Sequence, residues 1–174
     1  MEFYLELEEM SNHDKEKENL VNVYVEIEQF SNVKYEYNKQ TTQLEIDRLL
    51  NKPYVYPYAY GFIVNTLAED GDELDILIVS DDKKNIFKND AYYNVYIIGA
   101  LDMEDEKGRD QKVLCVSEED YSKIKDIQDL TDTVKNNIYR FFVNYKNDAP
   151  GKWSKVTQFM NKYEAVKLYK ESKL

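Results

Sequence analysis

The stretch that decides the fold is YVYPYAYGFIVNTLAEDGDELDILIV, residues 54–79. A tyrosine-rich turn with two prolines leads into the apolar run 62–64. An acidic turn centred on Gly71 follows, and the apolar run 76–79 comes directly after it. Short runs that are rich in β-branched residues and bounded by turn residues are typical of strands. The stretch therefore predicts two strands joined by an acidic loop.

This acidic loop carries three carboxylates, Asp70, Asp72 and Asp75. Two like charges about 5 Å apart repel by about 3 kcal/mol at an effective dielectric constant of about 20. The total stability of a domain is only about 5–15 kcal/mol, so a convergent cluster needs compensating cations. Either the side chains point into water, as is usual for an acidic turn, or they hold metal ions. The loop by itself leaves both interpretations open.

A second acidic turn occupies residues 103–112. In it, Asp105 and Asp110 lie five positions apart around a glycine, as Asp70 and Asp75 do in the first turn. Both turns adjoin apolar runs that are predicted to be neighbouring strands. The recurrence favours the metal-binding interpretation, because two such loops could combine their carboxylates in one site.

Length and composition predict a single domain over residues 1–174, with 43% apolar and 33% charged residues. No run approaches the roughly 18 apolar residues of a membrane span. The acidic segment 1–19 has neither the basic start nor the apolar core of a signal peptide, which predicts a cytoplasmic location. We expect this segment to be a mobile or surface-exposed extension of the domain.

The net charge of −11 argues against a nucleic-acid partner, because neutralising phosphates requires a basic surface. Cys115 is the only cysteine and is expected to be a small core residue. His13 is the only histidine and is expected to be solvated. Triads that need histidine or cysteine are thereby excluded, and no glycine-rich nucleotide-binding fingerprint is present. The chemistry left is that of carboxylates, lysine, arginine and tyrosine.

Alternation of apolar and polar residues predicts further strands at 20–30, 33–37, 44–49, 92–101 and 113–116. The first of these is expected to have one polar face. In the strand 44–49, parity places Arg48 on the apolar side, where a guanidinium needs a partner. A bulge at Asp47 would instead turn Arg48 out to solvent, and the two alternatives are equally supported.

After residue 120 the apolar period becomes helical. A helix is predicted over 131–146 with Thr131 as its N-cap, followed by a short edge strand at 152–156. A last helix is predicted over 157–171, with inward positions at Phe159, Tyr163 and Val166. Five to seven short strands followed by two helices predict an α+β fold, with the helices packed on a barrel or a strongly bent sheet.

Taken together, these segments resemble the soluble, magnesium-dependent (family I) inorganic pyrophosphatases. The resemblance covers about residues 21–156 and is carried by motifs in the family's order: VEIE around Glu26, KYE at 34–36, DR at 47–48, YPYAYGF at 56–62, DGDELD at 70–75, MEDEKGRDQK at 103–112, FFVNYK at 141–146 and GKW at 151–153. The acidic loop that follows the tyrosine motif is the most specific of these signals.

The resemblance implies a five-stranded OB-like barrel, closed or strongly bent, with two flanking C-terminal helices. It implies a Mg²⁺-dependent hydrolysis of pyrophosphate, with Mn²⁺ as a possible substitute, and assembly as homo-oligomers that are commonly hexamers. The implied metal ligands are Asp70, Asp75, Asp110, Asp105 and Glu26. The implied phosphate-binding residues are Lys34, Arg48, Tyr60, Lys112, Tyr145 and Lys146. Asp72 would be the general base, with Glu36 and Tyr56 in support.

The chain departs from the family pattern at two places. Glu73 stands where the family usually has proline, and it adds a charge beside the metals. Tyr96-Ile97-Ile98-Gly99 stands where the family commonly reads Arg-Pro-x-Gly. The second departure puts family packing or subunit contacts in doubt, but neither position carries the chemistry.

Two other functional classes stay open at the level of sequence. The acidic loops could hold a structural ion in a non-catalytic cation-binding module of the same fold. A barrel with exposed tyrosines could also bind an oligonucleotide or an oligosaccharide, although the net charge disfavours nucleic acid. Several basic residues also have ordinary explanations: Lys146 suits a helix C-terminus, Lys112 balances an acidic loop, and Lys34 with Glu36 suits a solvated strand face.

Overall fold

The computed structural model describes residues 18–80, 86–146 and 149–174. The expectation for His13, and that for most of the acidic segment 1–19, therefore lie outside the described residues. Within these ranges, no helix is long and apolar enough to cross a membrane.

The chain forms strands first and most of its helices later, as the sequence predicts. The strands are β1 (Leu20–Ile27), β2 (Val33–Asn38), β3 (Gln43–Leu49), β4 (Ala59–Ile63), β5 (Asp75–Ile78), β6 (Ala91–Asp105), β7 (Gly108–Arg109), β8 (Lys112–Val116) and β9 (Ser154–Met160). The helices are α2 (Glu118–Tyr121), α3 (Asp132–Asn144) and α4 (Lys162–Ser172), with a 3₁₀ turn η1 (Ile127–Asp129).

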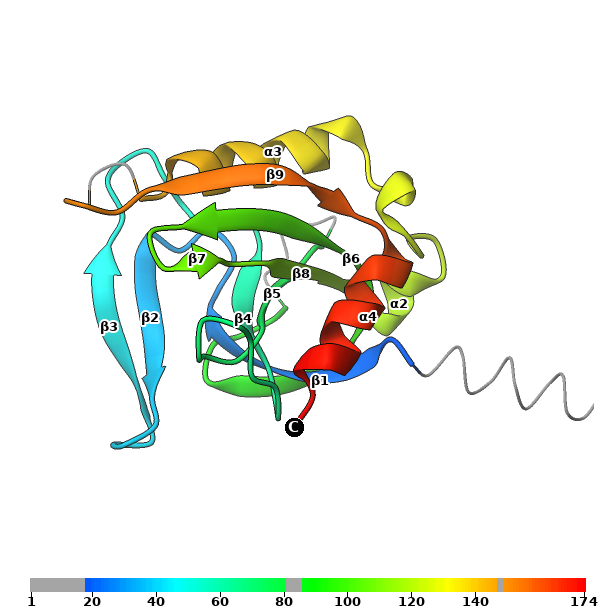
Figure 1. Cartoon of the computed structure of the whole chain (residues 1–174), viewed down its shortest axis with the longest axis horizontal. Coiled ribbons are helices and arrows are strands. Elements are labelled where there is room, and N and C mark those ends of the chain that lie inside the picture. Colours follow the sequence, from blue (N-terminus) through cyan, green and yellow to red (C-terminus); the bar gives the residue numbers. More distant parts are fainter. Residues whose placement is uncertain (1–17, 81–85, 147–148) are drawn as a thin grey trace, which may run out of the picture.

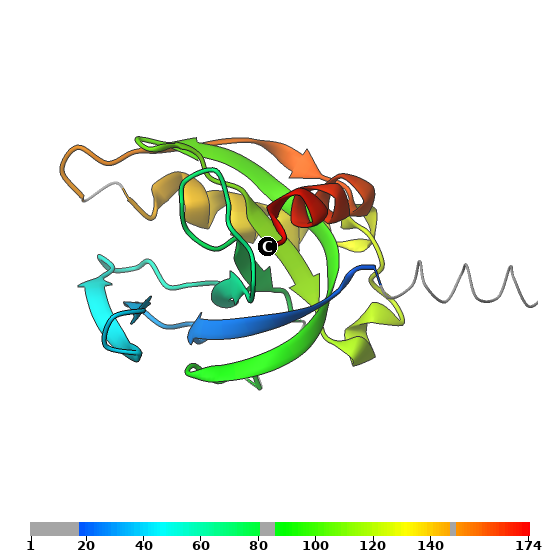
Figure 2. The same cartoon turned by 60° about the horizontal axis from the view of Figure 1, so that its bottom comes forward.

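Five strands form a ring in the order β1-β4-β5-β8-β6, which closes because β1 also pairs with β6 (Figure 1). Strands β5 and β8 are parallel, and the other pairs of the ring are antiparallel. The long strand β6 curves around the ring and pairs further along with β7 and β9 (Figure 2). The prediction of a strongly bent five-stranded arrangement is confirmed, but the two added strands mean that it is not a clean barrel.

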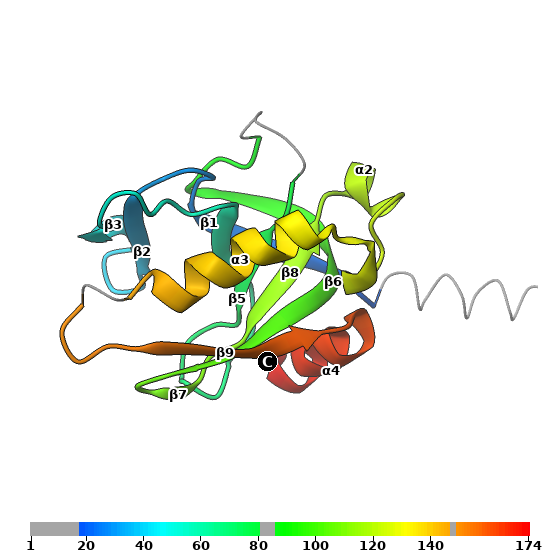
Figure 3. The same ribbon diagram turned by 90° about the horizontal axis from the view of Figure 1, so that it is seen from above.

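Alternating side chains of the ring strands enter two apolar clusters, because successive residues of a strand point to opposite faces. One cluster includes Leu77 and Leu114 and is completed by Phe142 of α3. The other includes Ile76 and is completed by Ala165 of α4. Figure 3 shows α3 lying alongside β9 over one side of the ring. The strands are therefore covered on both faces, as near-continuous apolar runs such as 76–79 require.

The prediction that β1 has a polar outer face is wrong at its C-terminal half. Tyr24 and Glu26 lie on that face and are buried, with exposed fractions of 2% and 8%. The hairpin of β2 and β3 accounts for this, because the ring of Tyr37 lies 5.3 Å from that of Tyr24. Only tertiary packing could supply this cover.

This hairpin forms a separate two-stranded sheet beside the ring (Figure 1). Its register shifts by one residue, since Lys34 pairs with Arg48 while Tyr35 pairs with Ile46. Asp47 is the extra residue, so the bulge considered from the sequence is present.

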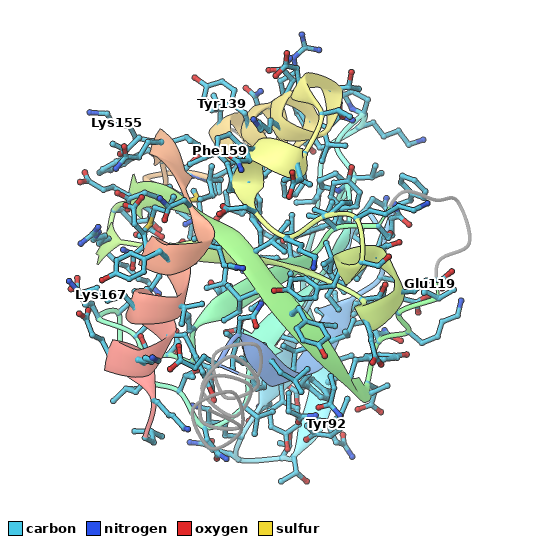
Figure 4. All side chains as sticks on the ribbon, turned by 90° about the vertical axis from the view of Figure 1, so that its right-hand side faces the viewer. Tyr92, Glu119, Tyr139, Lys155, Phe159 and Lys167 are labelled. Atoms are coloured by element: carbon cyan, nitrogen blue, oxygen red, sulfur yellow. The ribbon has the colours of Figure 1, made fainter. Side chains whose placement is uncertain are left out.

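The predicted last helix begins too early. Residues 157–160 belong to β9, which pairs with β6, so the predicted edge strand 152–156 is longer and shifted. The helix starts after Asn161, which forms a capping box with Glu164. Phe159 therefore lies on a strand, near α3 in Figure 4, and packs against the core. Tyr163, predicted to point inward, is 77% exposed.

The segment between β8 and α3 contains α2 and η1, which the sequence did not predict. The ring of Tyr121, at the end of α2, stacks on the ring of Tyr96 with centroids 4.4 Å apart. Gly99 lies against Ile127 of η1, where a β-carbon would come within 2.3 Å of that side chain. Tyr96, which departs from the resembled pattern, and Gly99, which keeps it, thus pack this segment onto β6. Strand β6 also runs beyond its predicted end to Asp105.

Candidate active site

The two acidic turns meet because the strands that follow them are parallel neighbours. Asp75, the first residue of β5, pairs with Lys112, the first residue of β8. The turn before each strand therefore emerges at the same end of the ring. Asp105, the last residue of β6, reaches this end from the antiparallel strand beside β8. The register of β5 against β8 thus decides which carboxylates share a site.

A cavity of about 700 Å³ opens at this end of the ring. All fourteen residues that the resemblance assigns to the site line it: Glu26, Lys34, Glu36, Arg48, Tyr56, Tyr60, Asp70, Asp72, Asp75, Asp105, Asp110, Lys112, Tyr145 and Lys146. They come from strands, turns and a helix end that lie far apart in the chain. The structure thus brings the whole predicted set together, which is the arrangement a single site needs.

The buried side chain of Thr66 anchors the backbone of the first acidic turn. The hydroxyl of Thr66 donates to the carbonyl of Ile63 at 2.7 Å and accepts from the amide of Leu74 at 3.0 Å. Within the turn, the amide of Asp72 donates to Oδ1 of Asp70 at 3.1 Å. Gly71 has a φ of +88°, a conformation that glycine adopts without strain. These contacts fix the backbone, while the carboxylates of Asp70 and Asp72 stay exposed.

Lys112 stands at the centre of the carboxylates. Its Nζ lies 2.7 Å from Oδ2 of Asp75, 2.9 Å from both carboxylate oxygens of Asp110, and 2.9 Å from the hydroxyl of Tyr60. Only 2% of Lys112 is exposed. Burial acts to lower its pKa, but Asp75 and the other anions around it raise the pKa well above the usual value. Lys112 is therefore a buried, charged ammonium ion that neutralises converging carboxylates.

Asp105 forms a second centre with Lys146. Oδ2 of Asp105 lies 2.9 Å from Nζ of Lys146, and its Oδ1 accepts from the amide of Lys107 at 2.9 Å. Burial acts to raise the pKa of Asp105, but these hydrogen bonds lower it, and the net pKa lies below the usual value. Lys146 follows the end of α3 by two residues, and its ammonium group contacts the carboxylate of Asp105.

Glu26 is one of three buried carboxylates among the predicted metal ligands, together with Asp105 and Asp110. Its Oε2 accepts from the amide of Tyr37 on the hairpin at 2.8 Å. Burial raises its pKa to about 8, since the hydrogen bond only partly offsets the cost of charge. Burial likewise raises the pKa of Asp110 to about 6 despite the attraction of Lys112. Both carboxyl groups are poised to gain stability from an added cation.

The hairpin supplies two cations to the cavity. Nζ of Lys34 lies 2.7 Å from Oδ2 of Asp47, and Nη2 of Arg48 donates to the carbonyl of Tyr145 at 2.9 Å. The guanidinium carbon of Arg48 is 6.0 Å from the centre of the Tyr145 ring. The bulge at Asp47 therefore does not send Arg48 into solvent, and instead directs it to the cavity wall.

Three tyrosines form the floor of the cavity. Tyr56 and Tyr60 lie with ring centres 5.3 Å apart, and Tyr145 packs against Phe142. Burial raises the pKa of Tyr56 and of Tyr60 well above the usual value, so both phenols keep their protons. Among the described residues, the buried hydroxyl of Tyr56 has no hydrogen-bond partner. Tyr145 packs in the core and also lines the cavity.

The donor chemistry of the cavity fits a hard cation. Eleven carboxylate side chains line it against seven lysine and arginine side chains, an excess of four negative charges when all are ionised. Across the described residues, no three acidic, histidine or cysteine side chains are close enough to hold one metal ion by themselves. Mg²⁺ usually takes only one or two carboxylates and keeps several waters, so the oxygen donors here suit it.

Several further residues that line the cavity have no site role assigned from the sequence. They are Asp47, Lys39, Glu73, Glu106, Lys107 and Lys152, and all of these except Lys39 lie within the quoted motifs. Lys39 lies in a polar turn, where nothing in the local sequence distinguishes a cavity residue from a solvated one. Cys115 is fully buried in the core as predicted, and burial raises the pKa of its thiol, so it takes no part in the site.

Comparison with known proteins shows which family the chain is similar to. A family model described as inorganic pyrophosphatase matches residues 23–173. An inorganic pyrophosphatase of Nanoarchaeum equitans is 41% identical over 156 residues, covering 87% of this chain and 94% of that protein. One of Gluconobacter oxydans is 40% identical over 162 residues, covering 91% of this chain and 92% of that protein.

Solved structures give the same result. An inorganic pyrophosphatase of Helicobacter pylori superimposes with a TM-score of 0.84 at 37% identity, covering 90% of this chain and 93% of that one. One of Thermus thermophilus gives a TM-score of 0.83 at 38% identity, covering 88% and 89% of the two chains.

Proposed function

The chain belongs to the inorganic pyrophosphatase family, and from that premise we propose that it hydrolyses pyrophosphate to two orthophosphates by attack of a metal-activated water, with Asp72 as general base. The observation that carries the proposal is the single cavity lined by carboxylates, cations and phenols. Phosphoryl transfer needs positioning and charge neutralisation more than covalent chemistry, and these groups supply both.

Pyrophosphate is a compact polyanion, and the cavity has more carboxylates than basic groups. Binding therefore requires divalent cations to enter with the substrate or ahead of it. The same excess of negative charge disfavours a nucleic-acid strand in the cavity. The non-catalytic alternative, a module that only holds an ion, leaves Lys34 and Lys146 as partners of Asp47 and Asp105, whereas phosphate binding explains why they share one cavity with Arg48.

We assign the metal ions to five carboxylates. Asp70, Asp75 and Asp110 would hold the first metal, with Asp75 also contributing to the second, while Asp105 and Glu26 would help bind the metals that accompany the substrate. In the described structure these carboxylates do not yet lie close enough for three of them to hold one ion, so binding the first metal would have to draw Asp70, Asp75 and Asp110 together. Hard oxygen donors favour Mg²⁺, with Mn²⁺ as a substitute. When bound, such ions supply a water that loses its proton near neutral pH.

Asp72 would take the proton of the attacking water onto a carboxylate oxygen. Its side chain is exposed at the edge of the cavity, while its backbone is fixed on both sides. Its amide donates to Asp70 at 3.1 Å, and its carbonyl accepts from the amide of Ala68 at 2.7 Å. A base held in this way keeps its position while the side chain can still reach a water.

The basic and phenolic groups would bind the two phosphates and neutralise the charge that develops on the leaving phosphate. They are Lys34, Arg48, Tyr60, Lys112, Tyr145 and Lys146. Glu36 and Tyr56 would support them: Glu36 lies between Lys34 and Tyr37 on β2, and Tyr56 packs against Tyr60. Lys34 and Lys146 already neutralise Asp47 and Asp105, so the substrate would compete with carboxylates for these ammonium groups.

Phosphate release from pyrophosphate, measured with Mg²⁺ and with a chelator, tests this function. We expect release only with Mg²⁺, and its loss in Asp72→Asn with fold and metal binding retained. The control is Asp132→Asn, an exposed aspartate of α3 that does not line the cavity. Full activity in Asp72→Asn would remove Asp72 as the base. Metal binding without any phosphate release by the unaltered chain would favour the non-catalytic module.

The remaining expectations stay predictions. Assembly as a homo-oligomer, with a hexamer as the expected form, is tested by the mass of the native protein in solution. The cytoplasmic location and the lack of a membrane partner are separate predictions. A titration with an oligonucleotide at low salt would directly test the predicted lack of a nucleic-acid partner.

A further inference from the structure

The turn of the β2–β3 hairpin and the first acidic turn are joined across the mouth of the cavity. Nζ of Lys39, at the hairpin turn, lies 2.8 Å from Oε1 of Glu73. Both residues line the cavity, and the side chain of Glu73 is 22% exposed against 60% for Lys39. Glu73 is the residue that stands where the family usually has proline, so proline at this position could not make the contact.

Away from its packed tyrosine, Tyr37, the hairpin has few contacts that hold its position. It is a separate sheet that stands beside the ring in Figure 1, and none of its residues is fully buried. The ring of Tyr37 packs on that of Tyr24, the amide of Tyr37 donates to Glu26, and Arg48 donates to the carbonyl of Tyr145. Beyond these contacts the turn 39–42 is exposed. An element with so little buried surface is expected to open more readily than the ring.

The two sides that this ion pair joins carry different parts of the proposed machinery. The hairpin carries Lys34 and Arg48, which would bind phosphate, whereas the acidic turn carries Asp70 and Asp72. Glu73 directly follows Asp72, the proposed general base, so a contact of Glu73 also restrains the turn that carries this base. The separation of these two sides decides whether one pyrophosphate can contact both.

We propose that Lys39 and Glu73 are positioning residues, whose ion pair holds the hairpin against the acidic turn and keeps the cavity in its substrate-binding arrangement. The inference rests on the proposed function, because it assigns these residues a role in pyrophosphate binding. Neither residue needs to touch the substrate.

The expected effect is modest and sensitive to salt. Ion pairs with an exposed partner contribute about 0.2–1 kcal/mol, which corresponds to about a 1.4- to fivefold change in an equilibrium. Salt screens such a pair. Losing the pair should therefore raise KM for pyrophosphate about 1.4- to fivefold, with kcat changed less than KM, and the difference from the unaltered chain should shrink at high salt.

A double-mutant cycle tests the pair. Lys39→Ala, Glu73→Ala and the double variant should show the same rise in KM, because each lacks the one contact. Lys39→Arg keeps the contact and should restore the original KM. The matched control is the exposed pair of Lys170 and Glu18, 3.1 Å apart and outside the cavity, whose alanine variants should leave KM unchanged.

The double variant separates this proposal from simple attraction of the anionic substrate by Lys39. It has the same net charge as the unaltered chain, so attraction alone predicts an unchanged KM. An unchanged KM in the double variant would therefore overturn the proposal.

Hydrogen exchange at the backbone amides of residues 39–42 provides a readout that does not need activity. Exchange should be faster in Lys39→Ala and Glu73→Ala than in the unaltered chain and in Lys39→Arg. Equal exchange in all of them would refute the link. If the unaltered chain releases no phosphate with Mg²⁺, the proposed function fails, while the exchange measurement still decides whether the pair holds the hairpin.

Discussion

Replacing Lys112 by methionine should strongly destabilise the metal-free protein and affect the metal-bound protein much less. The change keeps the length of the side chain and removes the ammonium group. That group neutralises Asp75 at 2.7 Å and Asp110 at 2.9 Å, and its own side chain is only 3% exposed. Both carboxylates would be left without their positive partner inside the protein.

The magnitude follows from the burial of the pair. Removing one partner of a buried ion pair costs about 3–5 kcal/mol, because an uncompensated charge is left behind. Asp75 is partly exposed, with 24% of its side chain accessible, so water offsets part of the cost. We therefore expect a loss near the lower limit, about 3 kcal/mol. For a chain of this size, that corresponds to a fall in Tm of about 6–12 °C.

Thermal and urea unfolding of Lys112→Met, with chelator and with Mg²⁺, measures this effect. A divalent ion bound to the same carboxylates replaces the missing charge and stabilises the folded state by its binding free energy, so Mg²⁺ should restore much of the loss. The control is Lys170→Met, which removes a half-exposed ammonium group and should cost less than about 1 kcal/mol. A loss in Lys112→Met no larger than in this control would refute the central position assigned to the ammonium group.

Three further changes probe the ring, the acidic turn and the buried carboxylate. Gly61→Ala should cost at least about 3 kcal/mol or prevent folding in an expression and unfolding test, because a β-carbon there would lie 1.8 Å from the carbonyl oxygen of Tyr24. Thr66→Val should cost about 1–3 kcal/mol in urea and weaken Mg²⁺ binding in a titration, since the amide of Leu74 loses its acceptor; unchanged binding would show that the turn does not need this anchor. In chelator, the unaltered chain should lose up to about 4 kcal/mol of stability as the pH rises from about 4.5 to 8, because folding raises the pKa of Glu26 to about 8 and the protonated form is favoured. Glu26→Gln should flatten this decline, and an unaltered pH slope would contradict the assignment.

Local sequence was sufficient for most of the strands and for the N-cap of α3 at Thr131. It failed at residues 157–160, Thr-Gln-Phe-Met, where two polar and two apolar residues are too few to distinguish a helical period from a strand. Pairing with β6 decides that segment, and the capping box at Asn161 was the overlooked signal. It failed also for Tyr24, because the hairpin that covers this ring belongs to another part of the chain.

The candidate site divides in the same way. The motif resemblance names fourteen residues, and all of them line the cavity, but spacing alone left Lys34, Lys112 and Lys146 with ordinary structural explanations. The choice for Arg48 shows why. The sequence leaves the bulge at Asp47 as one of two equally supported alternatives, and the direction of the Arg48 side chain depends on the position of Tyr145.

By itself, the sequence determined the available chemistry. With no cysteine or histidine in a reactive setting, and with two spaced acidic turns, it restricted the site to carboxylates, cations and phenols. Only the tertiary structure decided which of these groups meet, since the parallel register of β5 against β8 sets Asp75 beside Lys112 and the closure of β1 on β6 completes the ring. The physical reason is that register and closure arise from contacts between residues distant in the chain, and burial then sets the charge of Glu26 and Lys112 in ways that no local pattern encodes.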